Sequence, residues 1–468
     1  MTRRYVRRLL LLVSAAFLLP LIALAWWGVV RAGTLDRSPT NVRSALDSPL
    51  NGRGRILDRN GAVLAEDVRL PNGTLVRHYT TASLAQVIGY VSPTYGLSGL
   101  EQTDNGVLTG TEPIDPLRRV WYDVARLRPA PYDLRLTIDL PLQHAADAAL
   151  GNRAGAIVVL DAHTGAVLAM VSKPDYDPNQ LDQLAPSLLR DPSHPLLNRA
   201  TQGLFVPGSV FKTITASAAL DTGAYQADAR FSCTEPLYVQ GFRIGCENAP
   251  PGGGSYDFAL AYGLSVNRNF AQIALTLGWN TLADYTHRFL VGQSIPFDIE
   301  TAAGRLTEEE TPRTPVLLAN TGFGQGQILV TPLNMALIAA TVADGGRAPH
   351  PYLVDAILRR DGSAAWQHTT QWFPRAISAA TAADLRSFMR TTVTQAWGKE
   401  AAVPGVAVGG KTGTAETGDG QQTHAWFTGI APVQDPQVVI AVLAEHGGIG
   451  ATVAAPIAGQ VLRAYFHR

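Results

Sequence analysis

The chain places Ser209 three residues before Lys212, directly after a Pro-Gly pair, and Lys212 is one of only four lysines. Nearly every other positive charge is an arginine, so a position that needed only charge would be expected to hold arginine. A lysine amine can lose its proton in a suitable site, whereas a guanidinium effectively never does. Lys212 is therefore a candidate base for the Ser209 hydroxyl.

A turn at Pro207 and Gly208, followed by a helix that begins at or near Ser209, would bring these two side chains together. Residues i and i+3 of a helix lie on one face. The positive end of the helix dipole also favours the alkoxide that develops when the serine attacks. The alternative is a capping serine followed by a surface lysine, and the Ser-x-x-Lys spacing alone does not decide between the two.

Two further short motifs lie downstream. Ser265 and Asn267 form a Ser-x-Asn triplet, and a second group of polar residues reads Lys411, Thr412, Gly413 and Thr414. A lysine on a strand beside a glycine lets another group approach the backbone closely, and the two threonines offer hydroxyl and N–H groups to a carboxylate. Each motif alone also fits an ordinary strand end or turn, so their order and spacing carry the meaning.

The elements that must position these motifs alternate between strands and helices. Hydrophobic periodicity predicts a strand, a helix and a strand pair within residues 134–172, followed by Ala-rich helices at 213–223, 333–346 and 381–393. It then predicts three strands within 403–446 and a last helix at 454–466. This order predicts an α+β fold in which distant segments share one mixed or antiparallel sheet.

Length and composition exclude several classes of protein. At 468 residues the chain should form two or three domains. Hydrophobic residues make up 46% and charged residues 16%, with a formal net charge of +0, which argues against nucleic-acid binding. The chain has no His-Glu-x-x-His or Cys-x-x-Cys motif, so no metal site is expected. The glycine-rich segment 322–327 lacks the context of a nucleotide-binding loop and is interpreted as structural.

The amino terminus has the pattern of a membrane anchor. Four arginines within the first eight residues precede an uncharged stretch from Leu9 to Val30, which as a helix would be about 33 Å long and could cross the hydrocarbon core. The arginines predict a cytoplasmic amino terminus, with everything after Arg31 outside. The alternative is a cleaved signal peptide with Ala23 to Ala25 at the cleavage site.

If the protein is exported, the two cysteines, Cys233 and Cys246, can form a disulfide. They lie thirteen residues apart in a Gly- and Pro-rich stretch. In an oxidising compartment a disulfide that closes a surface hairpin is the preferred interpretation, and two buried free thiols are the alternative.

Taken in order, Ser-x-x-Lys, Ser-x-Asn and Lys-Thr-Gly form the motif set of penicillin-binding proteins and serine β-lactamases. The chain resembles class B penicillin-binding proteins, and especially the compact penicillin-binding protein A group, from about residue 50 to its end. Stretches that carry the resemblance include RGRILDRNG, LTIDLPLQ, GFGQGQILVTPLNMA and HAWFTGIAP. Two features depart from the family pattern: Val266 stands where many relatives carry Cys or Ser, and the amino-terminal module is short.

The resemblance implies a domain organisation. Residues 1–31 would form a cytoplasmic tip and transmembrane anchor, and residues 32–133 an extended, mixed α/β pedestal of the dimerisation type. Residues 134–468 would form the transpeptidase domain, with a central, mostly antiparallel sheet flanked by helices.

The resemblance also implies a role for each motif. Ser209 would attack the peptide bond between the two terminal D-alanines of a cell-wall stem peptide, and Lys212 would take its proton. Backbone N–H groups of Ser209 and Thr414 would stabilise the oxyanion. An amine of a neighbouring stem peptide would then attack the acyl-enzyme and form a cross-link.

The remaining motif residues would support these steps. Ser265 would relay a proton to the leaving amine, Lys411 would tune its electrostatics, and Asn267 would hold the substrate amide. The Thr412–Thr414 stretch would bind the terminal carboxylate. β-Lactams would acylate the same serine, and no cofactor is expected.

Other functions share this chemistry. A D,D-carboxypeptidase differs only in using water as the acceptor. A β-lactamase also needs a base for the deacylating water, such as a glutamate, for which the sequence offers no convincing candidate. A β-lactam sensor or a non-catalytic scaffold would need acylation or docking alone. The resemblance favours a single-pass membrane enzyme that docks a polytopic glycan-strand polymerase of the SEDS family, and leaves open whether it serves elongation, division or sporulation.

Overall fold

The computed structural model describes residues 2–27, 52–111, 130–418 and 420–467. Residues 28–30 of the predicted apolar stretch, and 32–51 and 112–129 of the predicted pedestal, lie outside the described residues. Helix α1 spans Thr2–Ala25, so it begins within the arginine-rich segment rather than at Leu9. Among the described residues, no helix meets the length and apolarity needed to span a membrane.

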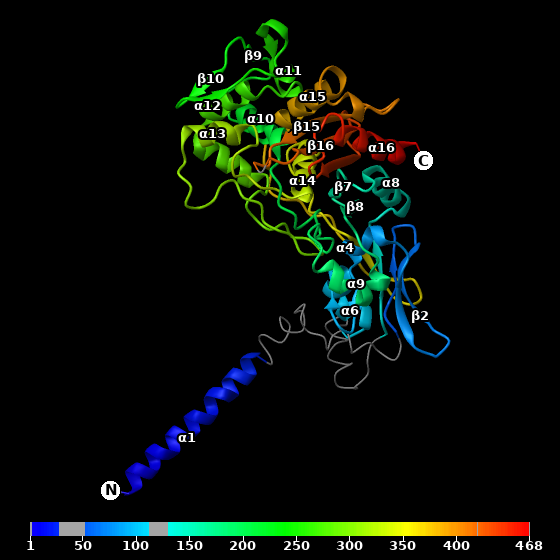
Figure 1. Ribbon diagram of the computed structural model, residues 1–468. Coiled ribbons are helices and arrows are strands. Elements are labelled where there is room, and N and C mark those ends of the chain that lie inside the picture. The colour runs from blue at the N-terminus through cyan, green and yellow to red at the C-terminus, as the bar shows by residue number, and fades with distance from the viewer. Residues whose placement is uncertain (1, 28–51, 112–129, 419, 468) are drawn as a thin grey trace.

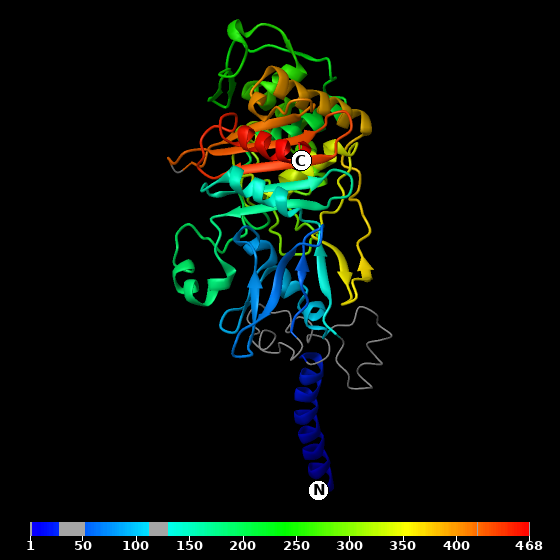
Figure 2. The same ribbon diagram turned by 90° about the vertical axis from the view of Figure 1, so that its right-hand side faces the viewer.

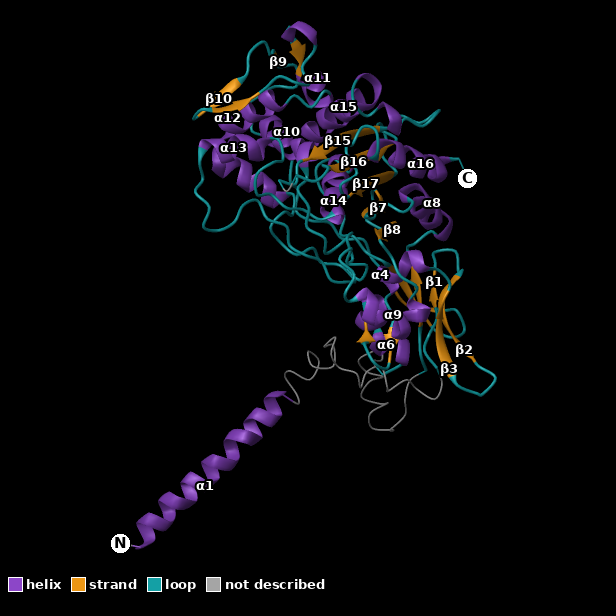
Figure 3. Ribbon diagram, in the orientation of Figure 1, coloured by secondary structure: helices purple, strands orange, loops and turns teal. Residues whose placement is uncertain are grey.

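A five-stranded sheet forms the centre of the larger folded part (Figures 1 and 3). Its order is β15-β16-β17-β7-β8 and all four neighbouring pairs are antiparallel. The strands are β7 (Gly155–Asp161), β8 (Val167–Lys173), β15 (Gly409–Ala415), β16 (His424–Ala431) and β17 (Val438–Ala444). The predicted α+β class with a mostly antiparallel central sheet is therefore confirmed.

Helices cover both faces of this sheet, and every residue of β16 and β17 is accordingly buried. Trp426 and Phe427 illustrate the alternation, since successive residues belong to different cores. The core with Phe427 includes α8 (Leu140–Leu150) and α16 (Ala454–Phe466). The core with Trp426 includes α10 (Lys212–Asp221), α11 (Phe258–Gly263), α12 (Asn267–Arg288), α13 (Pro315–Gly322), α14 (Pro332–Ala343) and α15 (Ala379–Gln395).

A second sheet, of six strands in the order β14-β13-β6-β1-β2-β3, lies below the five-stranded sheet in Figure 2. Its strands are β1 (Ile56–Leu57), β2 (Val63–Arg69), β3 (Leu75–Tyr79), β6 (Asp133–Leu136), β13 (Val354–Leu358) and β14 (Ala364–Gln367). We call residues 52–111 and 130–136 the amino-terminal module. Strands β13 and β14 join its sheet from residues 354–367, so the chain returns across the predicted boundary at 133/134.

Short elements complete the fold. The amino-terminal module contains β4 (Val91–Ser92), β5 (Gly96–Leu97), α4 (Ala85–Ile88), α5 (Gly99–Thr103) and α6 (Asn105–Thr109), and α9 (Leu181–Leu188) lies beside it in Figure 1. Two small hairpin-like pairs, β9 (Arg230–Phe231) with β12 (Tyr256–Asp257) and β10 (Leu237–Val239) with β11 (Phe242–Ile244), lie at the opposite end.

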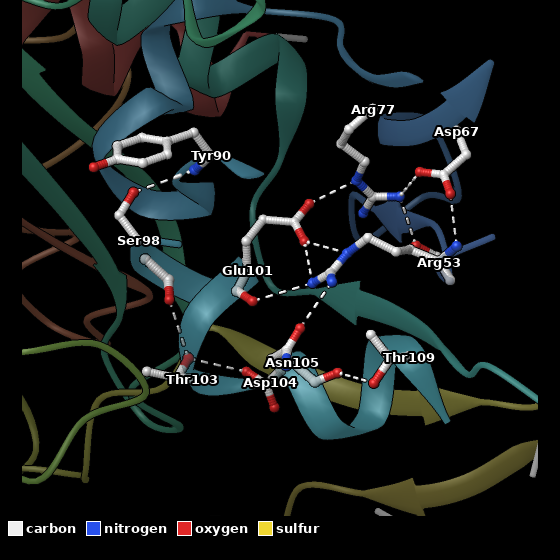
Figure 4. A network of polar contacts seen from close by, with 12 residues as sticks. Arg53, Asp67, Arg77, Tyr90, Ser98, Glu101, Thr103, Asp104, Asn105 and Thr109 are labelled. Carbon is white, nitrogen blue, oxygen red and sulfur yellow. Dashed lines mark hydrogen bonds and ion pairs between the residues drawn. The ribbon is translucent and has the colours of Figure 1, made fainter. Parts of the chain in front are cut away.

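A buried ion cluster holds the amino-terminal module together (Figure 4). Arg53 donates to Glu101 Oε2 from Nε and Nη2, at 3.0 and 2.7 Å. Arg77 donates to Glu101 Oε1 at 2.6 Å and pairs with Asp67 at 3.1 Å. Burial alone would raise the pKa of Glu101, but the two arginines outweigh it and lower that pKa. We call these four residues the arginine cluster.

Candidate active site

A tight turn brings Ser209 to the edge of the five-stranded sheet. The segment Gly208–Phe211 is a 3₁₀ turn that leads into α10, so the predicted helix start near Ser209 is confirmed. Gly208 has φ of +56°, and a Cβ on it would lie 2.7 Å from the Thr414 carbonyl oxygen. Only glycine fits this position without strain, and the contact places the serine turn directly against β15.

The glycine-rich segment 322–327 supports that turn from its other side. The Gly208 N–H donates to the Gly324 carbonyl at 2.9 Å. Gly324 has φ of +83°, and a Cβ on it would lie 1.8 Å from the Gly208 carbonyl oxygen. The segment therefore holds the backbone of the serine turn, as expected of a structural loop.

Lys212 lies at the centre of the cluster. Its Nζ is 3.1 Å from Ser209 Oγ, 2.9 Å from Ser265 Oγ and 2.6 Å from Asn267 Oδ1. A further contact of 2.7 Å joins Nζ to the Ser265 carbonyl oxygen. The structure thus brings the Ser-x-x-Lys and Ser-x-Asn motifs together around a single amine.

The surroundings of Lys212 favour its neutral form. The side chain is fully buried, and among the described residues its polar partners are hydroxyl, amide and carbonyl oxygens, with no carboxylate. Burial, together with the charge of Lys411, holds the pKa of Lys212 well below its usual value. A buried lysine without a counter-ion that lies within hydrogen-bond distance of a serine has the properties of a general base.

Ser265 reaches this cluster through an unusual backbone. Its φ of +64° lies in the left-handed region that serine rarely adopts, between the end of α11 and the start of α12. Val266, which follows, is fully buried in the hydrophobic core. Val266, which departs from the family pattern, therefore fills the core, while the side chains of Ser265 and Asn267 on either side of it contact Lys212.

The Lys-Thr-Gly motif lies on β15, the edge strand next to the serine turn. Lys411 is fully buried, donates to the Thr412 carbonyl at 3.0 Å, and lies 5.5 Å from the Tyr262 ring centroid. Burial lowers the pKa of Lys411 to about 7. Gly413 is tightly enclosed, since a Cβ there would lie 3.0 Å from side-chain atoms of both Trp426 and Val210.

The two threonines of this motif differ in exposure. Thr412 is buried, whereas Thr414 is exposed and its hydroxyl accepts a hydrogen bond from the Gly450 N–H at 3.2 Å. Thr414 is thus the more accessible of the two predicted carboxylate-binding residues.

The two cysteines lie in the segment between α10 and α11. Cys233 and Cys246 form a disulfide that brackets the β10–β11 hairpin. Asn248, two residues past the second cysteine, donates to the Ser265 carbonyl at 3.4 Å. The disulfide therefore anchors a segment that contacts the serine of the middle motif.

Three residues around the site were not predicted from the sequence. Tyr262 packs against Lys411 and shares a 2.9 Å hydrogen bond with Thr213, and the Phe270 ring centroid lies 5.3 Å from Lys212 Nζ. Both aromatic residues lie three positions from a motif residue, a helical spacing that could have indicated them. Asn248 carries no such signal.

Two parts of the chain match known protein families. Residues 155–463 match the family described as penicillin binding protein transpeptidase domain, and residues 53–129 match the penicillin binding protein A dimerisation domain. The chain is 33% identical to a peptidoglycan D,D-transpeptidase PbpA of Mycolicibacterium smegmatis, with 93% of each chain covered. It is 32% identical to a protein of that name from Mycobacterium tuberculosis, with 98% of each covered.

The solved structures that resemble this chain include D,D-transpeptidases and penicillin-binding proteins. A ceftriaxone acyl-enzyme complex of penicillin-binding protein A from M. tuberculosis is similar with a TM-score of 0.81 and 30% identity, covering 91% of this chain and all of that one. The D,D-transpeptidase domain of a peptidoglycan glycosyltransferase from Eggerthella lenta has a TM-score of 0.79 and 31% identity, covering 89% of this chain and 98% of that one.

Proposed function

Because the chain belongs to the penicillin-binding protein transpeptidase family, we propose that it cross-links peptidoglycan through an acyl-enzyme on Ser209. It is a serine-type D,D-transpeptidase and a target of β-lactams. The observation that carries the assignment of residues is the position of the Lys212 amine, 3.1 Å from Ser209 Oγ and 2.9 Å from Ser265 Oγ, with no carboxylate partner among the described residues.

Acylation begins at Ser209. As Oγ attacks the carbonyl carbon between the two D-alanines, its proton passes to neutral Lys212, and the N–H groups of Ser209 and Thr414 stabilise the negative oxygen. When the tetrahedral intermediate collapses, the C–N bond breaks and the proton returns through Ser265 to the departing D-alanine amine. Serine and peptide are then joined as an ester.

Other residues hold the substrate during this step. Asn267 hydrogen-bonds the substrate amide, and the Thr412–Thr414 stretch binds the terminal carboxylate. Burial, together with the charge of Lys411, keeps the pKa of Lys212 low. An acceptor amine then attacks the ester carbonyl and gives up its proton to Lys212. As the bond between the carbonyl carbon and Ser209 Oγ breaks, Lys212 passes that proton to Oγ, and the new amide cross-link leaves Ser209 and Lys212 ready for another cycle.

A stem-peptide assay separates the transpeptidase from the carboxypeptidase. Full-length protein would receive a synthetic donor ending in D-Ala-D-Ala together with an amine acceptor, and mass spectrometry would follow products. We expect cross-linked product that requires both acceptor and Ser209, with Ser209→Ala as the inactive control. Release of D-alanine at the same rate without acceptor, and no cross-linked product, would assign a carboxypeptidase. Turnover of β-lactam would assign a β-lactamase.

The proposal includes a membrane location, with the amino terminus in the cytoplasm and the catalytic domain outside. Its support is the group of four arginines at positions 3–8, which the uncharged stretch Leu9–Val30 follows. Intact mass of the protein extracted from washed membranes tests this. An uncleaved anchor retains residues 1–31, whereas loss of residues 1–25 would identify a signal peptide.

We also propose that the amino-terminal module docks a polytopic polymerase of the SEDS family, so that strand synthesis and cross-linking occur together. The support is the match of residues 53–129 to a module shared with penicillin-binding protein A. Co-purification from membranes, compared between the full chain and a variant with charge reversals on exposed module residues, tests it. Retention by both proteins, or by neither, would contradict the proposal.

A further inference from the structure

The backbone of Ser265 is held on both sides by groups from other parts of the chain. Its φ of +64° is unfavourable for a residue with a Cβ, and such a conformation persists only where the surrounding structure imposes it. Because peptide groups are planar, the orientations of the two that flank a residue set its φ and ψ. The hydrogen bonds of these two peptide groups therefore show what holds the serine in place.

The peptide group that precedes Ser265 is held by a tryptophan side chain and by the backbone of α11. The indole Nε1 of Trp397 donates to the Leu264 carbonyl oxygen at 2.9 Å, across 133 residues of sequence. The Ser265 N–H donates to the Tyr262 carbonyl oxygen at 3.1 Å. An indole N–H can only donate, so this side chain suits a carbonyl oxygen and nothing else at that position.

Close packing between α11 and α15, which lie side by side in Figure 1, brings Trp397 to this carbonyl. Gly263 is the last residue of α11, and a Cβ on it would lie 3.1 Å from Ala396 Cβ and 3.4 Å from the Thr392 backbone. The N–H of Gly398 donates to the Thr392 carbonyl oxygen at 2.9 Å. The residues before and after Trp397 are thus fixed against α11 and α15, and they direct the indole toward Leu264.

The peptide group that follows Ser265 is held by two other side chains. Its carbonyl oxygen accepts from Lys212 Nζ at 2.7 Å and from Asn248 Nδ2 at 3.4 Å. The Val266 N–H donates to the Ala261 carbonyl oxygen at 3.2 Å. With both peptide groups fixed, the hydroxyl of Ser265 lies 2.9 Å from Lys212 Nζ.

We propose that Trp397 is a positioning residue for the proton relay through Ser265 and acts through the Leu264 carbonyl. This inference rests on the proposed function, in which Ser265 passes a proton from Lys212 to the departing amine. As the C–N bond breaks, the amine nitrogen takes a proton from Ser265 Oγ, and Oγ takes one from Lys212 Nζ. A Ser265 hydroxyl that is turned away slows this transfer and leaves the attack by Ser209 Oγ intact.

Two donors that differ in the leaving atom test this role. The first ends in D-Ala-D-Ala, so that an amine leaves and must gain a proton. In the second, thiolactate replaces the last D-alanine, which keeps the terminal carboxylate and makes a thioester. A thiol has a pKa of roughly 8.5, so it leaves as a thiolate without needing a proton. The full-length protein is mixed with each donor, and rapid-quench mass spectrometry gives the rate constant for acylation of Ser209.

Trp397→Phe removes the indole N–H and keeps an aromatic ring. Because Trp397 is 47% exposed, water can reach the Leu264 carbonyl in the variant, so the fold is kept and only the orientation of the peptide group is lost. Acylation by the amide donor should slow by about three- to tenfold, the range for one hydrogen bond, whereas acylation by the thioester donor should change by less than about twofold.

Trp366→Phe is the matched control. Trp366 is 40% exposed, similar to Trp397, but lies in β14 of the six-stranded sheet. The rate constants for both donors should equal those of the wild type.

A Ser265→Ala background separates positioning from a general structural role. Once the hydroxyl is absent, its orientation no longer matters. Trp397→Phe added to Ser265→Ala should therefore leave the amide rate constant within about twofold of Ser265→Ala alone. Acylation by the thioester donor shows in the same experiment that each variant is folded.

Three results would overturn the proposal. The first is an equal loss of rate for both donors in Trp397→Phe, which would indicate a general structural role. The second is an unchanged amide rate constant in that variant. The third is a full effect of Trp397→Phe in the Ser265→Ala background. A wild type that forms no acyl-enzyme with either donor would instead refute the proposed function, and with it the relay.

Discussion

The molecule buries two groups of cations and treats them in opposite ways. In the arginine cluster, Arg53 and Arg77 share the fully buried carboxylate of Glu101. In the active site, Lys212 and Lys411 are equally buried, but among the described residues neither pairs with a carboxylate. Burial alone would lower the pKa of Arg77, yet Glu101 and other neighbours raise it. The pKa of each lysine falls.

This difference shows that the desolvation cost of burying a cationic side chain serves structure in the arginine cluster and chemistry in the active site. An arginine that meets a carboxylate stays charged and fixes the packing of strands and helices around it. A lysine that loses water without gaining a counter-ion gives up its proton instead and becomes a base. The active site is therefore defined as much by the missing carboxylate as by the serine.

The largest expected effect comes from Lys212→Arg. The variant places a permanently charged guanidinium where the wild type has a base that can be neutral, so acylation of Ser209 by penicillin should slow by about 10²–10⁴-fold. Stopped-flow or time-resolved mass measurement gives the rate constant. Lys173→Arg is the matched control, because Lys173 pairs with Asp147 at 3.0 Å outside the site. A Lys212→Arg variant that acylates at the wild-type rate would remove the general-base role.

The converse change is Glu101→Gln, which removes the carboxylate that Arg53 and Arg77 share and leaves Asp67 as the carboxylate of the arginine cluster. Because neither Arg53 nor Arg77 can lose its proton, the free energy of unfolding should fall by about 3–5 kcal/mol. Urea unfolding of the full-length protein measures it, and folded protein should still react with penicillin. The exposed pair Arg243–Glu247 provides the control, since Glu247→Gln should change stability by less than about 1 kcal/mol. Equal small effects would contradict the comparison.

A smaller effect is expected when the charge of Lys411 is removed. Lys212 acts as a base only when neutral, so acylation declines as pH falls through its folded pKa. Lys411 is charged below its own pKa of about 7 and lowers the pKa of Lys212. Lys411→Gln should raise the pKa of Lys212, so that the acylation rate begins to fall at a higher pH. Lys411→Arg should leave the pH at which the acylation rate falls unchanged. The pH profile of the acylation rate constant decides this. An acid limb that is identical in Lys411→Gln and wild type would be inconsistent with electrostatic coupling.

Much of the catalytic fold could be predicted from the sequence because its signals are local. The mostly apolar segments that became β16 and β17, and the Ala-rich segments that became α10 and α14, appear where periodicity places them. The three motifs also indicated which residues would meet, although only the structure gives the distances around Lys212.

Other features depend on contacts between distant segments and carry no local signal. The pairing of β13 with β6 joins residues more than two hundred positions apart, so no window of sequence indicates it. The left-handed backbone of Ser265 is imposed by the junction of α11 and α12.

The measurement that tests the central claim most directly is the intact mass of the full-length protein after reaction with penicillin, followed by peptide mapping. The wild type should carry one stable adduct on the peptide that contains Ser209, formed more slowly as pH falls, and Ser209→Ala should carry none. An adduct on Ser209→Ala, or a wild-type rate that does not decline at low pH, would contradict a serine activated by a neutral buried lysine.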